Sequence, residues 1–139
     1  MSTLTDHLIA ARVDALEEWQ TEHAQAMSNH DLDESLAEVF GLSRDISDIL
    51  DQAPESRRKR HVEWLEGQRI FGRLLLVTEG LRDLARVIGS FEGRLQFPEK
   101  AVDGLIAFWR RAIQTGLPSQ RMKLDLDLTN LPPRIRTPE

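Results

Sequence analysis

The hydrophobic positions of this chain recur every three or four residues through most of its length, a spacing that predicts amphipathic helices. The first predicted helix covers about residues 3–28, and Thr3 or Thr5 is suited to cap its N-terminus ahead of Asp6. Its apolar face is formed by residues at helical intervals: Ile9, Val13, Leu16 and Trp19 or Gln20.

A second predicted helix, over about residues 31–53, has the most regular pattern. Its apolar side follows alternating steps of four and three residues, the heptad repeat of closely packed helices: Leu32, Leu36, Val39, Ser43, Ile46, Leu50 and Ala53. Gly41 either lies within one continuous helix or divides it into two, with Ser43 capping the second. Pro54 ends the segment, because a proline ring is incompatible with a helix interior.

Pro54 also suits the first turn of a third predicted helix, over about residues 55–88. Its apolar side is a second regular series: Ile70, Leu74, Val77, Leu81, Leu84 and Ile88. Residues 74–77 are apolar on nearly all sides, which predicts the most buried part of the protein. Glycines at 67, 72 and 80 each lower helix stability by about 1 kcal/mol relative to alanine. They indicate either a close helix crossing or a break, and both alternatives stay open.

After a loop over residues 90–97, Pro98 begins a fourth predicted helix, which ends near Thr115, before Gly116 and Pro118. Its buried face is predicted to contain Val102, Leu105, Ile106, Trp109 and Ile113. We therefore expect an all-α fold, a helical bundle of about four helices, in a domain over residues 1–118.

The pattern changes to a period of two in the last twenty residues. Apolar side chains alternate with polar ones there, as in a half-buried strand: Met122, Leu124, Leu126 and Leu128. The segment 124–128 resembles the short leucine-alternating repression motif of plant transcription factors; the likeness covers five residues, and the helices show nothing similar to a plant DNA-binding domain. We expect residues 119–139 to form an extended or strand-like C-terminal arm that docks on the bundle, on a second copy or on another chain. Leu131 extends this set. Trp64 lies off the apolar side of its helix and next to the basic run, and it either stacks on a nucleic-acid base, fills a partner pocket or packs internally.

The composition is that of one folded domain: 139 residues, of which 40% are hydrophobic and 29% charged. No cysteine occurs, which excludes disulfides and thiolate chemistry. The N-terminal residues lack the pattern of a secretory signal, and the longest apolar run, residues 74–77, is far shorter than a membrane span. We expect a cytoplasmic protein with no membrane partner. Arginine is far commoner than lysine, which suits a GC-rich bacterial or phage genome.

Charge is divided between the two halves of the chain. Residues 1–53 contain 12 acidic and two basic side chains, a net of −10, whereas residues 54–139 contain 11 acidic and 16 basic ones, a net of +5. Such a division predicts internal complementarity, pairing with a second copy, or a charged partner.

The strongest local charge feature is the basic run Arg57-Arg58-Lys59-Arg60, at a helix N-terminus where the helix dipole disfavours cations. One interpretation is binding of nucleic acid or another anion, with Arg69 and Arg73 contributing. The other is attraction to the acidic first half, or simple solvation. Glu66 is placed to pair with Arg69 or Arg73 at helical spacing.

No motif of catalysis, metal binding or nucleotide binding occurs, so we expect no enzyme activity, no cofactor and no metal site. The sequence favours a protein–protein interaction module: an adaptor, an assembly factor or a small subunit of a larger complex. A homodimer fits the charge division. The alternative is a nucleic-acid-associated small helical subunit that binds phosphates through the basic run.

Overall fold

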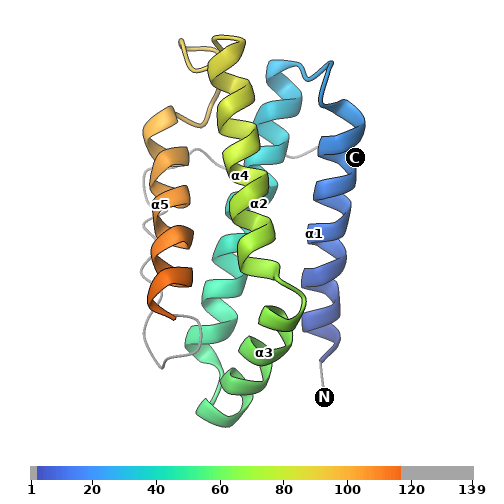
Figure 1. Ribbon diagram of the computed structural model, residues 1–139, viewed down its shortest axis with the longest axis vertical. Helices are drawn as coiled ribbons and strands as arrows, with labels where there is room; N and C mark the ends of the chain where they lie inside the picture. Colours follow the sequence, from blue (N-terminus) through green and yellow to red (C-terminus); the bar gives the residue numbers. More distant parts are fainter. Residues whose placement is uncertain (1–2, 117–139) are drawn as a thin grey trace.

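A computed structural model describes residues 3–116 of the protein, and this range folds into five helices without a strand. The helices are α1 (Leu4–His23), α2 (Asn29–Gln52), α3 (Glu55–Gly67), α4 (Ile70–Val87) and α5 (Glu99–Thr115). In Figure 1, α1 and α5 form opposite edges of the bundle, α4 passes in front of α2 between them, and α3 lies at the lower end. The predicted all-α bundle is confirmed, whereas the predicted C-terminal arm lies outside the described residues.

The first two helices begin at capping boxes that the local sequence encodes. The Thr3 hydroxyl accepts a hydrogen bond from the Asp6 backbone N–H at 3.2 Å, and the Asp6 carboxylate accepts one from the Thr3 N–H. Ser28 and Asp31 repeat this exchange at the start of α2. Each box satisfies two backbone donors that a helix N-terminus leaves without intrahelical partners.

The central element is α2, which contributes buried side chains around most of its circumference. Six of the seven residues in its predicted heptad series are buried, and Gly41 does not interrupt the helix. The expectation that residues 74–77 would be the most buried part is wrong, because Leu76 is 70% exposed and Leu75 only half-buried. The outer side of α4 faces solvent between α1 and α5, so the apolar run has one uncovered side.

The third predicted helix is divided into α3 and α4. Gly67 is the last residue of α3, and Arg69 adopts a left-handed conformation with φ +57° before α4 begins at Ile70. The Arg69 N–H donates to the Glu66 carbonyl at 2.9 Å, and the Gln68 N–H donates to the Trp64 carbonyl at 3.1 Å. These bonds satisfy two of the last four carbonyls of α3 within a two-residue junction.

Side chains of α2 hold the loop that leads to α5. Asp33 is buried and accepts hydrogen bonds from the backbone N–H groups of Gln96, at 2.9 Å, and Phe97, at 3.5 Å. The Ser90 hydroxyl donates to Asn29 Oδ1 at 2.6 Å. These contacts fix the position from which α5 starts.

The buried face of α5 closes the core. Trp109 is fully buried, and its indole N–H donates to the Ser43 hydroxyl at 2.9 Å. Ser43 is the polar residue of the heptad series of α2, and this hydrogen bond gives both buried polar groups a partner. The Ser43 hydroxyl in turn donates to the Val39 carbonyl. Ile113 was predicted to lie on the buried face but is 43% exposed, whereas its neighbour Ala112 is fully buried, so the buried face of α5 ends at Ala112.

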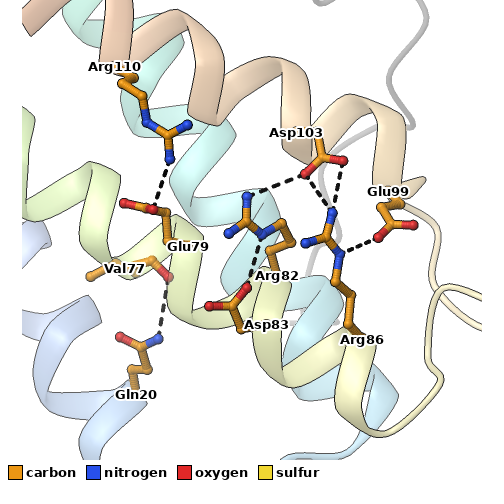
Figure 2. A network of polar contacts seen from close by, with 9 residues as sticks. All are labelled: Gln20, Val77, Glu79, Arg82, Asp83, Arg86, Glu99, Asp103 and Arg110. Atoms are coloured by element: carbon orange, nitrogen blue, oxygen red, sulfur yellow. Dashed lines mark hydrogen bonds and ion pairs between the residues drawn. The ribbon is translucent and has the colours of Figure 1, made fainter.

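Ion pairs connect α4 to the helices on both of its sides. Toward α5, Arg86 pairs with Glu99 and Asp103, and Arg110 pairs with Glu79 at 3.0 Å (Figure 2). Toward α1, Arg73 pairs with Asp14 and Glu17. The predicted internal complementarity between the acidic and basic halves therefore exists at the contact between α1 and α4.

Candidate interaction surface

The N-terminus of α1 is fastened to α3 by a buried polar contact. His61 Nδ1 lies 2.6 Å from Asp6 Oδ1, and both side chains are buried. Because a carboxylate only accepts, the imidazole N–H is the donor. The other carboxylate oxygen of Asp6 serves the capping box, so one side chain starts α1 and joins it to α3.

Trp64 belongs to the same junction between α1 and α3. It is half-buried, and its ring meets the His7 ring edge-on with centroids 4.9 Å apart. Packing within the chain describes the contact of Trp64 with His7. Its side chain is only half-buried, so base stacking and partner binding stay predictions.

The basic run is split by the helix on which it lies. Arg58 is buried, whereas Arg57, Lys59 and Arg60 are exposed. Lys59 lies 4.0 Å from the Glu63 carboxylate, one turn along α3. Consecutive residues of a helix point in different directions, so the four cations do not form one continuous patch.

The two other predicted anion-binding arginines have different surroundings. Arg69 is exposed at the left-handed junction, beside Glu66 in the lining of a small pocket of about 190 Å³. Arg73 does not pair with Glu66; it reaches α1, where hydrogen bonding to Glu17 raises the pKa of its guanidinium. Arg73 is thus engaged in the contact between helices, while Arg69 remains accessible.

The outer side of α1 carries an apolar stripe that the sequence reading missed. Leu4 is 76% exposed and Leu8 55% exposed, and Ala11 and Ala15 are exposed in line with them. The steps of four, three and four residues place all of these on one face of the helix, opposite the buried face. The same spacing is present in the sequence, but the series Ile9, Val13 and Leu16 on the other side of the helix has larger apolar side chains and was predicted as the buried face.

A groove runs beside this stripe, between α1 and α2. Its volume is about 280 Å³, and its lining combines apolar and acidic side chains: Arg12, Ala15, Leu16, Trp19, Glu34, Ser35 and Glu38. Arg12 crosses from α1 to Glu38 and Asp45 of α2, at 2.9 Å in each case. We call the stripe Leu4, Leu8, Ala11 and Ala15 the outer face of α1.

The remaining sequence predictions concern the C-terminal arm, metal binding and the membrane. The proposed partner-binding residues of the arm lie outside the described residues: Met122, Leu124, Leu126, Leu128 and Leu131. Within residues 3–116, no group of three or more histidine and carboxylate side chains is arranged to hold a metal ion. None of the described helices combines the length and the apolar character needed to cross a membrane.

In comparisons with protein-family models, curated proteins and solved structures, no match to this chain was found.

Proposed function

We propose that this protein is a non-enzymatic interaction module, an adaptor, assembly factor or small subunit of a larger complex, that docks through its helical faces and its C-terminal arm. The observation that supports this most is the outer face of α1. Single exposed leucines are ordinary, but an aligned apolar stripe on a helix is typical of a surface that packs against another protein.

The arm is the second part of the proposal. Its alternating apolar side chains, at 122, 124, 126 and 128, suit docking by groove filling or by strand addition to a partner. An apolar side chain that becomes fully buried contributes about 1.5–3 kcal/mol, so a few of them are sufficient for a specific contact.

Affinity capture from the native cell tests this function. The full chain, a variant lacking residues 119–139, Leu8→Glu and the control Leu76→Glu are used as baits, and captured proteins are compared by quantitative mass spectrometry. Leu76 is a matched control because it is also an exposed leucine, on α4. We expect specific partners to be lost with the truncation or with Leu8→Glu and kept with Leu76→Glu. The same captured set with all four baits would contradict the proposal.

A second candidate function is nucleic-acid binding at α3. Arg57 and Arg60 are exposed, and no ion pair among residues 3–116 includes either of them. Binding of fluorescent single- and double-stranded oligonucleotides is measured while salt is raised. A fall in log K of about 0.9 per log unit of salt for each phosphate contact, abolished by Arg57→Glu with Arg60→Glu, would support this function. No binding at low salt would remove it.

A further inference from the structure

We propose that the outer face of α1 is the interface of an antiparallel homodimer, in which α1 of one copy packs against α1 of a second copy. This inference rests on the proposed function, because it names the occupant of one of the proposed docking faces. It leaves the C-terminal arm for a different partner.

The basic end of this surface lies where α3 meets the N-terminus of α1. Arg57, Arg60 and Trp64 share one side of α3, since residues three, four and seven apart lie on the same side of a helix. Trp64 contacts His7 of α1, so this side of α3 is turned toward α1. Arg57 and Arg60 therefore stand beside the beginning of the apolar stripe, without an ion-pair partner in residues 3–116.

The acidic end of the surface lies at the other end of α1. Glu18 and Glu22 are exposed and continue the line of Ala11 and Ala15 by helical spacing. Neither carboxylate takes part in an ion pair with another described residue. From the N-terminus of α1 onward, the surface therefore contains the cations of α3, then the outer face of α1, and then the two carboxylates.

This order of charges favours a second copy of the chain as the partner and an antiparallel arrangement of the two α1 helices. A second copy turned by a two-fold axis across the middle of the stripe sets the cations of each copy opposite the carboxylates of the other, at both ends. A parallel arrangement would place cations against cations and carboxylates against carboxylates. A two-fold contact of the antiparallel kind is closed, so association stops at two copies.

The sizes of the side chains fit the same arrangement. With the axis midway between Leu8 and Ala15, Leu8 of one copy lies over Ala15 of the other, and Leu4 lies over Trp19. Ala11 is near the axis, where a small side chain allows two helices to approach closely. Leu4 to Trp19 is 15 residues, so the contact is about 22 Å long at 1.5 Å per residue.

One helix pair of this length covers less surface than the roughly 800 Å² per partner of a standard stable interface. We therefore expect a reversible dimer with a dissociation constant in the micromolar range. The oligomeric state of the full chain is measured by sedimentation velocity and light scattering over a concentration series. The expected result is a rise from the monomer mass to twice that mass, with Leu8→Glu weakening association at least about tenfold. The control Leu76→Glu, on α4, leaves it unchanged.

A charge exchange tests the direction of packing. The variant Glu18→Lys with Glu22→Lys has two basic ends, and the variant Arg57→Glu with Arg60→Glu has two acidic ends. Each variant alone is expected to associate more weakly than the wild type, and an equal mixture of the two is expected to recover a heterodimer. Circular dichroism checks that all variants keep the helical fold.

Three results would overturn the inference. The wild type could stay monomeric at high micromolar concentration, which would leave the face for the arm or for another protein. Dimerisation could be lost with Leu76→Glu and kept with Leu8→Glu, which would place the contact on α4. The mixture of charge variants could fail to form a heterodimer. If the chain is monomeric but captures a different protein, the proposed function stands and the homodimer inference fails. If the chain is a dimer but captures no other protein, the homodimer inference stands and the proposed function fails.

Discussion

At the residue scale, the single carboxylate of Asp6 makes two structural contacts. One oxygen accepts a hydrogen bond from the backbone of Thr3 in the capping box of α1, and the other accepts from His61 of α3. Asp31 has the equivalent capping role in α2, but among the described residues it makes no hydrogen bond to a side chain of another helix; its only contact with α1 is the charge interaction with His23. The pair therefore separates the effect of a cap from that of a contact between helices.

We predict that Asp6→Ala lowers the free energy of unfolding by about 2–4 kcal/mol. About 1 kcal/mol comes from the cap and 1–3 kcal/mol from leaving the buried imidazole donor unsatisfied. The matched variant Asp31→Ala is expected to lose about 1 kcal/mol, from the cap alone. Urea unfolding followed by circular dichroism measures both, and equal losses would show that the bond to His61 contributes nothing.

Asp33 is a second residue whose environment has a measurable consequence. Burial raises the pKa of its carboxyl above the ordinary value of 3.8, although hydrogen bonds from Gln96 and Phe97 act in the opposite direction. A carboxyl with a raised pKa in the folded state binds its proton more readily there than in the unfolded chain. Its ionisation therefore disfavours the folded state, and this effect disappears as the pH falls through the folded pKa.

Asp33→Asn is predicted to be as stable as the wild type or more stable at pH 7, because the amide oxygen accepts the same backbone hydrogen bonds without a buried charge. The advantage over the wild type should shrink as the pH is lowered toward 3.8, the ordinary carboxyl pKa. Asp33→Ala, which leaves the two N–H groups unsatisfied, should lose about 1–3 kcal/mol. Urea unfolding at several pH values checks the three proteins; a gap between wild type and Asp33→Asn that widens at low pH would contradict the assignment.

At the element scale, two glycines of α4 have different surroundings. A Cβ atom added at Gly80 would lie 2.7 Å from Nε2 of Gln20, the amide that connects α1 to the Val77 carbonyl of α4. A Cβ atom added at Gly72 would meet nothing within 4 Å. Gly80 therefore leaves room for the Gln20 amide against α4, whereas no described residue packs on Gly72.

Gly72→Ala is predicted to stabilise the protein by about 0.5–1 kcal/mol, because alanine loses less conformational freedom in a helix. Gly80→Ala should gain little or nothing, since displacing Gln20 removes a hydrogen bond of about 0.5–1.5 kcal/mol. In a Gln20→Ala background, Gly80→Ala should regain the stabilisation seen at Gly72. Thermal and urea unfolding measure the set, and equal gains at both glycines in the wild-type background would show that the space Gly80 leaves for Gln20 contributes nothing to stability.

Local patterns were sufficient for most helix ends, but they did not decide the break between α3 and α4 or the surroundings of each helix. The heptad spacing of α2, the Thr3 cap and Gly116 after α5 are properties of short segments, and a short segment determines them. The exposure of Leu76 was not predictable, because leucines surround that turn of α4 and only the placement of α1 and α5 decides which one stays uncovered. At the break between α3 and α4, the left-handed conformation falls on Arg69 and not on Gly67, two residues earlier. The hydrogen bonds from the Gln68 and Arg69 N–H groups to the end of α3 determine which residue adopts it.

The candidate surface was harder to predict than the fold. The bond between Asp6 and His61 joins residues far apart in the sequence, and no periodic pattern connects them. The outer face of α1 was present in the spacing of Leu4, Leu8, Ala11 and Ala15. It was overlooked because two apolar stripes on one helix cannot be ranked as buried or exposed until the neighbours of that helix are known.

At the scale of the whole molecule, the helices differ in how completely the others surround them. Buried side chains occupy most sides of α2, whereas the first turns of α3 are largely exposed. Backbone amides exchange slowly where opening requires the core to separate and quickly where a turn can open alone.

We predict that amide hydrogen exchange is slowest in α2 and fastest, among the five helices, in the first turns of α3. Hydrogen exchange followed by mass spectrometry gives this order directly. Slower exchange in α1 than in α2 would contradict the central position of α2, and a uniform rate over all helices would indicate that the molecule opens only as one unit.

The three tryptophans of the chain are intrinsic fluorescence probes of its folding and association. Trp109 is fully buried and bonded to Ser43, so its fluorescence follows the integrity of the core. Trp19 is half-buried, stacks on His23 and borders the outer face of α1, and Trp64 marks the junction of α1 with α3. In variants that keep one tryptophan each, emission from Trp109 would report unfolding, while emission from Trp19 would report contact at α1. Folding and association could then be followed separately in the same solution, without attaching a dye.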